Sequence, residues 1–153
     1  MPSENPARQD SYPLVCYACG ALNRVPQGAV LSGGKCGKCS APLATRKPVD
    51  IDSTIFERLW THDKGRYVID VWAPWCGPCR MMAPAYEQAA QTLADHIRLF
   101  KLNSDTHQDV AARLGIRGIP TLIAYQGGRE IAKQAGAQTG DGLTQWIDSA
   151  FRA

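Results

Sequence analysis

The chain has 153 residues, of which 44% are hydrophobic and 20% are charged, and its formal net charge is +3. This composition is ordinary for a soluble globular protein, and the length allows one domain plus a small module. The first ten residues, MPSENPARQD, lack the apolar segment of a secretory signal, and no apolar run is long enough to cross a membrane. We therefore expect a cytoplasmic protein, in a compartment where structural disulfides are rare.

The N-terminal third predicts three short parts. Residues 1–13 are polar, contain three prolines and predict a disordered segment. Residues 14–43 are rich in Gly and Cys and too short to bury a core, so this module needs a crosslink, such as a bound metal or disulfides, to stabilise its fold. Residues 44–50, ATRKPVD, predict a linker because Pro48 disfavours helix. We expect the module to fold separately from residues 51–153.

From residue 51 onward, helical and strand patterns alternate along the chain. The first helix starts within DSTIFERLW, where Thr54 and Glu57 fit a capping box. The later elements are a strand at 67–72, a helix at 79–96, a strand at 97–103, a helix at 107–115, a hairpin of 121–125 with 129–134, and a helix at 143–151. This order predicts an α/β fold whose parallel core carries an antiparallel edge.

The six cysteines form three CxxC pairs, and the first two pairs predict a metal site. Cys16, Cys19, Cys36 and Cys39 have the form C-x2-C-x16-C-x2-C, a spacing typical of a four-thiolate zinc ribbon. Each CxxC turn can present two sulfurs to one tetrahedral ion, and the ion would supply folding energy that the module lacks. Zinc is favoured over iron because a structural site needs no redox function, and two disulfides are the remaining alternative.

The third pair, in WCGPC, predicts a redox-active dithiol. Cys76 follows the strand at 67–72 and lies at or near the start of the next helix, where free amides and the helix dipole stabilise a thiolate. Pro78 suits a first helical turn, and Cys79 lies three residues on, on the same face. We expect Cys76 to attack a substrate disulfide from the exposed end and the more buried Cys79 to resolve the mixed disulfide.

Asp70 interrupts the apolar strand YVIDVW six residues before Cys76. A buried carboxylate without a partner is costly, so the residue needs a reason to be there. From the residues alone, Asp70 is either a hydrogen-bonded structural residue or an acid/base that exchanges a proton with Cys79.

Residues 54–153 resemble the thioredoxin family. The resemblance rests on VWAPWCGPCR, KLNSD, LGIRGIPTL, the hairpin, AGA and the last helix, and the four-cysteine extension narrows it to the zinc-containing bacterial members. It implies a thioredoxin fold, a mixed central sheet flanked by helices, with a small N-terminal zinc ribbon. It also implies that Cys76 is the nucleophile, Cys79 the resolving thiol, Asp70 the buried carboxylate and Lys101 the lysine near it.

The resemblance further implies a substrate surface around the dithiol. Pro120 matches a proline in the cis form, although X–Pro bonds in general are cis only about 5–6% of the time. Val71 departs from the Phe of many members, and we expect this difference to affect packing alone. The residues that match the substrate-binding surface are Trp75, Gly77, Pro78, Gly118, Ile119, Gly136 and Ala137.

These patterns predict a monomeric thiol–disulfide oxidoreductase that reduces cytosolic proteins. By resemblance, NADPH-dependent thioredoxin reductase would reduce it again, and it would bind structural or regulatory zinc but no organic cofactor, nucleic acid or membrane. An alternative function is a zinc ribbon that binds protein or nucleic acid, with the second domain as a scaffold. Residues 1–48, with six Lys or Arg against two Asp or Glu, leave that alternative open. A disulfide isomerase or oxidase is a third reading, although Gly-Pro between the cysteines resembles the reducing type more.

Overall fold

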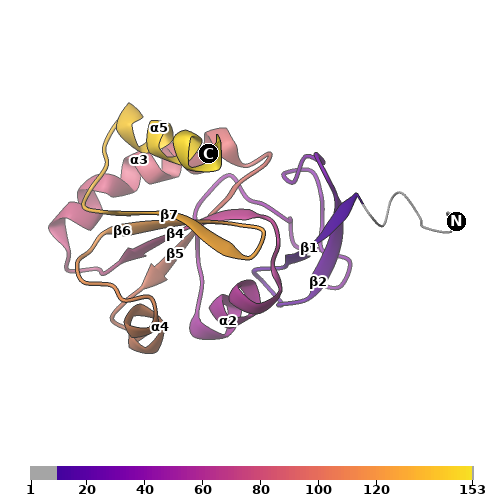
Figure 1. Cartoon of the computed structure of the whole chain (residues 1–153), viewed down its shortest axis with the longest axis horizontal. Coiled ribbons are helices and arrows are strands. Elements are labelled where there is room, and N and C mark those ends of the chain that lie inside the picture. The colour runs from indigo at the N-terminus through magenta and orange to yellow at the C-terminus, as the bar shows by residue number, and fades with distance from the viewer. Residues whose placement is uncertain (1–9, 153) are drawn as a thin grey trace, which may run out of the picture.

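The main sheet has five strands in the order β3-β5-β4-β6-β7 (Figure 1). The structure is a computed structural model and describes residues 10–152. β3, β5 and β4 run parallel, whereas β6 and β7 are antiparallel neighbours. The mixed α/β sheet with an antiparallel edge is therefore as predicted. The strands are β3 (Val49–Asp50), β4 (Arg66–Trp72), β5 (Arg98–Asn103), β6 (Thr121–Gln126) and β7 (Arg129–Ala135).

Helices cover both faces of this sheet. α2 (Ser53–His62) and α4 (Gln108–Arg113) lie below it in Figure 1, and α3 (Gly77–Leu93) and α5 (Asp141–Arg152) lie above. Because successive strand side chains point to opposite faces, Ile69 of β4 packs toward α2 and α4, whereas Val68 packs toward α3 and α5. The sheet thus has a separate apolar core on each face, and Asp70 shares the α3/α5 face with Val68.

The start of α2 differs from the predicted capping box. Asp52 is the N-cap, and its Oδ1 accepts a hydrogen bond from the Ile55 N–H at 2.8 Å. Glu57 instead forms an ion pair with Arg113 of α4. Asp52 satisfies a free amide of the first turn directly, and Glu57 is drawn to a guanidinium that sequence alone could not place beside it.

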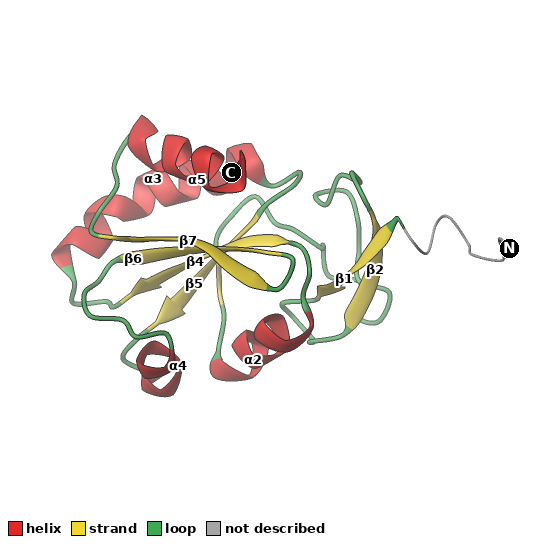
Figure 2. Ribbon diagram, viewed as in Figure 1, coloured by secondary structure: helices red, strands yellow, loops and turns green. Residues whose placement is uncertain are grey.

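The N-terminal module, residues 11–44, contains an antiparallel hairpin of β1 (Ser11–Val15) and β2 (Leu22–Pro26) (Figure 2). Residues 11–13 were predicted to be disordered, but they belong to β1 and are held by antiparallel pairing with β2. Residues 1–9 of that predicted segment lie outside the described part of the chain. The module has a small buried core of its own, formed by Leu14, Cys16, Val25, Leu31, Cys36, Leu43 and Ala44.

The module is docked on the main domain through hydrogen bonds and apolar contacts, while its separate folding stays a prediction. Val15 of β1 belongs to the core between the sheet and α2, and its N–H donates to Asp63 Oδ2 at 2.7 Å. The Leu31 N–H donates to the Asp95 carbonyl at 2.7 Å, at a second point of contact. The predicted linker is also partly strand, because its last two residues form β3 and pair with β5. Between residues 10 and 152, no helix has the length and apolarity required to span a membrane.

Candidate redox and metal sites

Cys76 and Cys79 form a disulfide at the first turn of α3, with Cα atoms 5.3 Å apart. Cys76 is the N-cap of this helix, and its Sγ accepts a hydrogen bond from the Cys79 N–H at 3.2 Å. A free helix amide directed at this sulfur favours the thiolate once the disulfide is reduced. The predicted placement of Cys76 at the helix start is therefore correct.

A groove of about 550 Å³ opens beside the disulfide. Cys76 lines this groove and Cys79 does not, although both residues are almost fully buried, at 3% and 4% exposure. The expected difference in exposure is thus absent, and the two cysteines differ instead in which one faces the groove. Of the predicted substrate residues, the groove brings together Trp75, Gly77, Pro78, Gly118 and Ile119.

Trp75 forms one wall of the groove and is 68% exposed. Its indole Nε1 donates a hydrogen bond to Asp105 Oδ2 at 2.9 Å, which fixes the orientation of the ring. Asp105 was not among the predicted site residues, because nothing in the sequence links it to a tryptophan 30 residues away.

The loop before β6 faces the disulfide. The Ile119–Pro120 peptide bond is cis, as the resemblance implies, and the Ile119 carbonyl oxygen lies 3.8 Å from Cys76 Sγ. The Gly136 N–H donates to the Pro120 carbonyl at 2.8 Å, so Gly136 lies directly beside this loop. Ala137 follows it and is exposed, and neither residue lines the groove.

Asp70 is buried on the α3/α5 face of the sheet, with 1% of its surface exposed, and its Oδ1 has no hydrogen-bond partner among residues 10–152. Burial raises the pKa of Asp70 to about 7, while the Lys101 ammonium opposes the shift and Asp50 adds to it. Asp70 and Lys101 are paired residues of β4 and β5. Trp72, two residues further along β4 on the same face, packs in one apolar cluster with both cysteines.

The four remaining cysteines come from two turns of identical backbone pattern. In the first turn, the Gly20 N–H donates to the Cys16 carbonyl and the Cys16 N–H donates to the Ala21 carbonyl; Cys36, Ser40 and Ala41 repeat this pattern in the second. Gly20 and Ser40 both have positive φ, 79° and 67°, at equivalent places. Amides also point at the sulfurs, with the Ala18 N–H 3.4 Å from Cys16 Sγ and the Lys38 N–H 3.4 Å from Cys36 Sγ.

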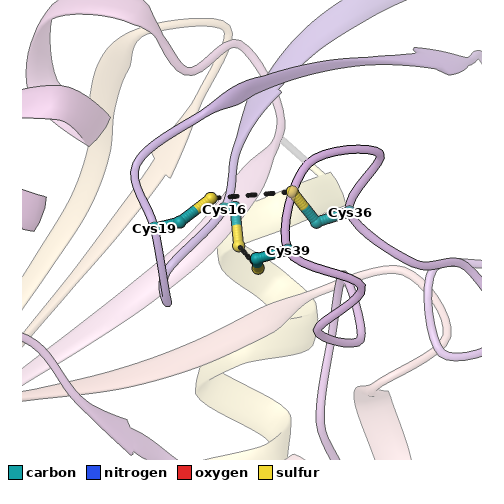
Figure 3. A group of neighbouring side chains, drawn as sticks. All are labelled: Cys16, Cys19, Cys36 and Cys39. Atoms are coloured by element: carbon teal, nitrogen blue, oxygen red, sulfur yellow. Dashed lines mark hydrogen bonds between the residues drawn. The ribbon is translucent and has the colours of Figure 1, made fainter.

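The four sulfurs converge on one point (Figure 3), and all lie within 4.8 Å of one another. The Sγ atoms of Cys16 and Cys39 are 3.6 Å apart, and those of Cys19 and Cys36 are 3.7 Å apart. A tetrahedral ion with Zn–S bonds of about 2.3 Å requires sulfur separations of about 3.8 Å. The residues fit a tetrathiolate metal site, and none of the four is in a disulfide.

Two cysteines of this cluster differ in how readily they form the thiolate that a metal binds. Hydrogen bonds from the Asn23 side chain and from nearby backbone amides lower the pKa of Cys36 to about 6, which favours its thiolate. Burial raises the pKa of Cys16 to about 12, so a metal must displace its proton. Asn23 Nδ2 lies 3.5 Å from Cys36 Sγ, a supporting contact that the sequence did not predict.

A disulfide at the start of a helix, beside a cis-proline loop on a mixed five-stranded sheet, defines a thiol–disulfide oxidoreductase. The chain belongs to the thioredoxin family, whose model matches residues 47–149. Residues 15–41 match a second, zinc-ribbon model that is described as thioredoxin 2, N-terminal.

Known relatives and structures agree with this assignment. Thioredoxin C-3 from Corynebacterium nephridii is 33% identical over 139 residues, covering 91% of this chain and 95% of that protein. Thioredoxin 1 from Nostoc sp. is 42% identical over 97 residues, covering 63% of this chain and 90% of the relative. Among solved structures, a mutant thioredoxin from Halobacterium salinarum NRC-1 has a TM-score of 0.62 at 29% identity and covers 70% of this chain and 93% of its own. Chloroplastic thioredoxin z has the same fold, with a TM-score of 0.62 at 22% identity over 70% of this chain and 96% of its own.

Proposed function

We propose that this protein reduces disulfides in other proteins by reversible oxidation of the Cys76–Cys79 pair. The observation that carries the proposal is the asymmetry of the pair, since Cys76 lines the groove and Cys79 does not. A substrate sulfur that enters the groove can therefore reach Cys76 alone.

The exchange proceeds in two displacements. In the reduced protein, the Cys76 thiolate attacks one sulfur of the substrate disulfide, a mixed disulfide forms, and the first substrate sulfur leaves as a thiolate. Cys79 then loses its proton and attacks Cys76 Sγ, which releases the second substrate thiolate and closes the intramolecular disulfide. Two electrons pass to the substrate, and the departing thiolates take up protons.

Asp70 is the proposed acceptor for the proton of Cys79. A pKa of about 7 allows the carboxyl to take and return a proton near neutral pH. Lys101 lies on the neighbouring strand and partly offsets the increase in the pKa of Asp70 that burial causes. Trp72 shares the sheet face of Asp70 and packs in one apolar cluster with both cysteines.

The groove and the loop before Pro120 are the proposed substrate surface. The lining is mostly apolar or small, and the backbone of Gly118 and Ile119 is available to an extended substrate segment beside Cys76. Gly136 and Ala137 continue this surface next to Pro120.

The tetrathiolate cluster is proposed to hold one Zn²⁺ through Cys16, Cys19, Cys36 and Cys39. A bound zinc ion would crosslink the two turns of the module and would supply no redox chemistry. The proposed location is the cytoplasm, a reducing compartment in which thiolate metal ligands are kept from forming disulfides. There, NADPH-dependent thioredoxin reductase is the proposed electron donor, and the protein acts as a monomer without a bound organic cofactor, nucleic acid or membrane.

The test is an NADPH-coupled assay that contains a thioredoxin reductase and a protein disulfide substrate. NADPH consumption should depend on this protein, and Cys79→Ser should accumulate a mixed disulfide with the substrate. Cys76→Ser is the matched control and should trap nothing. Trapping by Cys76→Ser instead would reverse the two roles, and failure of the unmodified protein to reduce any disulfide would reject the function.

A further inference from the structure

Three charged residues form one row across three neighbouring strands. Asp50 of β3 is the register partner of Lys101 of β5, and Lys101 is the register partner of Asp70 of β4. Register partners in adjacent strands point to the same face of a sheet. The row therefore consists of a carboxylate, an ammonium and a second carboxylate, and it runs from the sheet edge to the buried Asp70.

The indole of Trp72 ties this row together. Lys101 Nζ lies 4.2 Å from the centroid of the Trp72 ring, within the range of a cation–π interaction. At the edge of the ring, Trp72 Nε1 donates a hydrogen bond to Asp50 Oδ1 at 3.2 Å. Asp50 thus fixes the ring that holds the ammonium, and the same ring packs against Cys76 and Cys79.

The two carboxylates have opposite surroundings. Asp70 is 1% exposed, and one of its oxygens has no hydrogen-bond partner within the described part of the chain. Asp50 is exposed and lines a groove of about 470 Å³ between the N-terminal module and the main domain. Lys101 takes part in none of the four ion pairs found between residues 10 and 152, so its charge is not neutralised by direct contact with either acid.

We propose that Asp50 is a positioning residue for dithiol exchange. It holds the Trp72 ring over the Lys101 ammonium, and its negative charge offsets the stabilisation that this ammonium gives to the Asp70 carboxylate. This inference rests on the proposed role of Asp70 as the proton acceptor of Cys79. Asp50 acts only through Trp72, Lys101 and Asp70, and it does not touch the reacting sulfurs.

The two charged neighbours in the row shift the pKa of Asp70 in opposite directions. Lys101 lowers the pKa of Asp70, whereas Asp50 raises it. Tyr86 of α3 is a further titratable group that interacts with Asp70, and its hydroxyl donates to the Phe100 carbonyl at 2.7 Å. Around Asp50, the groove adds Tyr17, Cys19, Asp52 and His107.

Removal of the Asp50 charge should therefore lower the pKa of Asp70. Two strand spacings separate the residues by about 10 Å, at which one charge shifts a partly buried pKa by about half to one pH unit. Asp70 would then accept a proton from Cys79 at lower pH, and the acidic limb of the rate profile would move down by the same amount.

The experiment uses the full-length, metal-loaded protein with Asp50→Asn, which keeps an oxygen acceptor for Trp72 Nε1 but removes the charge. Asp52→Asn is the matched control, because it removes a neighbouring charge from the same groove and Asn still caps α2. The titration of Asp70 is followed by carboxyl NMR, and the rate of disulfide reduction is measured against pH. Asp50→Asn should move both midpoints down by about half to one unit, and Asp52→Asn should move them by less than a third of that.

A second comparison uses the Asp70→Asn background, in which Asp50→Asn should leave the pH profile unchanged because the two changes act on one group. Equal shifts in Asp50→Asn and Asp52→Asn, or an Asp50→Asn shift that persists without Asp70, would overturn the inference. The NMR titration separates this outcome from failure of the proposed function, since it reports on Asp70 even if the protein reduces no disulfide.

Discussion

Asp63 and Arg98 form a fully buried, two-pronged ion pair beneath the N-terminal module. Arg98 Nη1 and Nη2 each donate to one carboxylate oxygen of Asp63 at 2.8 Å. The same carboxylate accepts the Val15 N–H at 2.7 Å and the Gly65 N–H at 2.8 Å. One of the four hydrogen bonds that satisfy this buried charge therefore comes from the module, and the main domain alone does not complete it.

Removal of residues 1–47 should destabilise the main domain. The truncation uncovers the core around Val15 and removes a hydrogen bond to a buried carboxylate, and together these contribute roughly 2 to 4 kcal/mol. Urea unfolding of the truncated and full-length, metal-loaded proteins measures the difference. Molecules that stay folded should still reduce a small disulfide, because no module residue lines the groove beside Cys76. Equal unfolding free energies would show that the module contributes nothing to the domain.

Asp70→Asn should stabilise the protein at alkaline pH and much less at acidic pH. The pKa of Asp70 is raised from 3.8 to about 7 in the folded state, so the folded protein holds this proton more tightly than the unfolded chain. The cost of ionising Asp70 is absent below pH 4, grows as pH rises and is complete above pH 7. The gain in unfolding free energy should be on the order of 2–4 kcal/mol at pH 8. Chemical unfolding at several pH values tests this, and a gain that does not vary with pH would contradict it.

Asn23→Ala should weaken metal binding without removing a ligand. Asn23 Nδ2 lies 3.5 Å from Cys36 Sγ, and its Oδ1 accepts the Gly37 N–H at 2.9 Å. Loss of such a supporting contact typically lowers metal affinity by about 10 to 100-fold. Competition with a coloured zinc chelator measures the affinity, and Gln27→Ala serves as the control because Gln27 lines a separate groove with Lys64 and His96. Affinity should also fall as pH falls, since protons compete for the four sulfurs.

Trp75→Ala should raise KM for protein substrates more than it lowers kcat. The ring is 68% exposed on the groove wall and offers its area to a bound segment. Loss of such an aromatic contact costs about 1–2 kcal/mol, which is about 5 to 30-fold in kcat/KM. Trp75→Phe keeps a ring but loses the bond to Asp105, and should have a smaller effect. A fall confined to kcat would instead assign Trp75 a part in the chemical step.

The sequence was informative where one local signal decides the structure. Cys76 ahead of Gly77 and Pro78 predicted both the start of α3 and the redox pair, because an N-cap and a first-turn proline act within a few residues. The two CxxC turns likewise predicted the metal cluster, since each turn is a local structure that repeats the same backbone pattern.

Relationships set by tertiary packing were not predictable in this way. Asp63 and Arg98 are 35 residues apart, and each sequence context is ordinary for a surface charge. Asp50 was assigned to a linker, because only the register between β3 and β5 places it beside Lys101. A single sequence does not contain the register of two distant strands, so the row that ends at Asp70 became visible only in the fold.

The docking of the module through Val15 and Asp63 also limits where this module can be transplanted. Gly65 lies under the contact, and a Cβ at this position would be 2.6 Å from Arg98 Nη2 and 3.0 Å from the ring of Tyr12. In a host domain, a larger residue at this position would prevent the hairpin from docking, independently of its cysteines. A transplant that preserves the docking must therefore include the hairpin together with Asp63, Gly65 and Arg98. Residues 11–44 grafted alone onto another thioredoxin should bind metal but should not dock on the host domain.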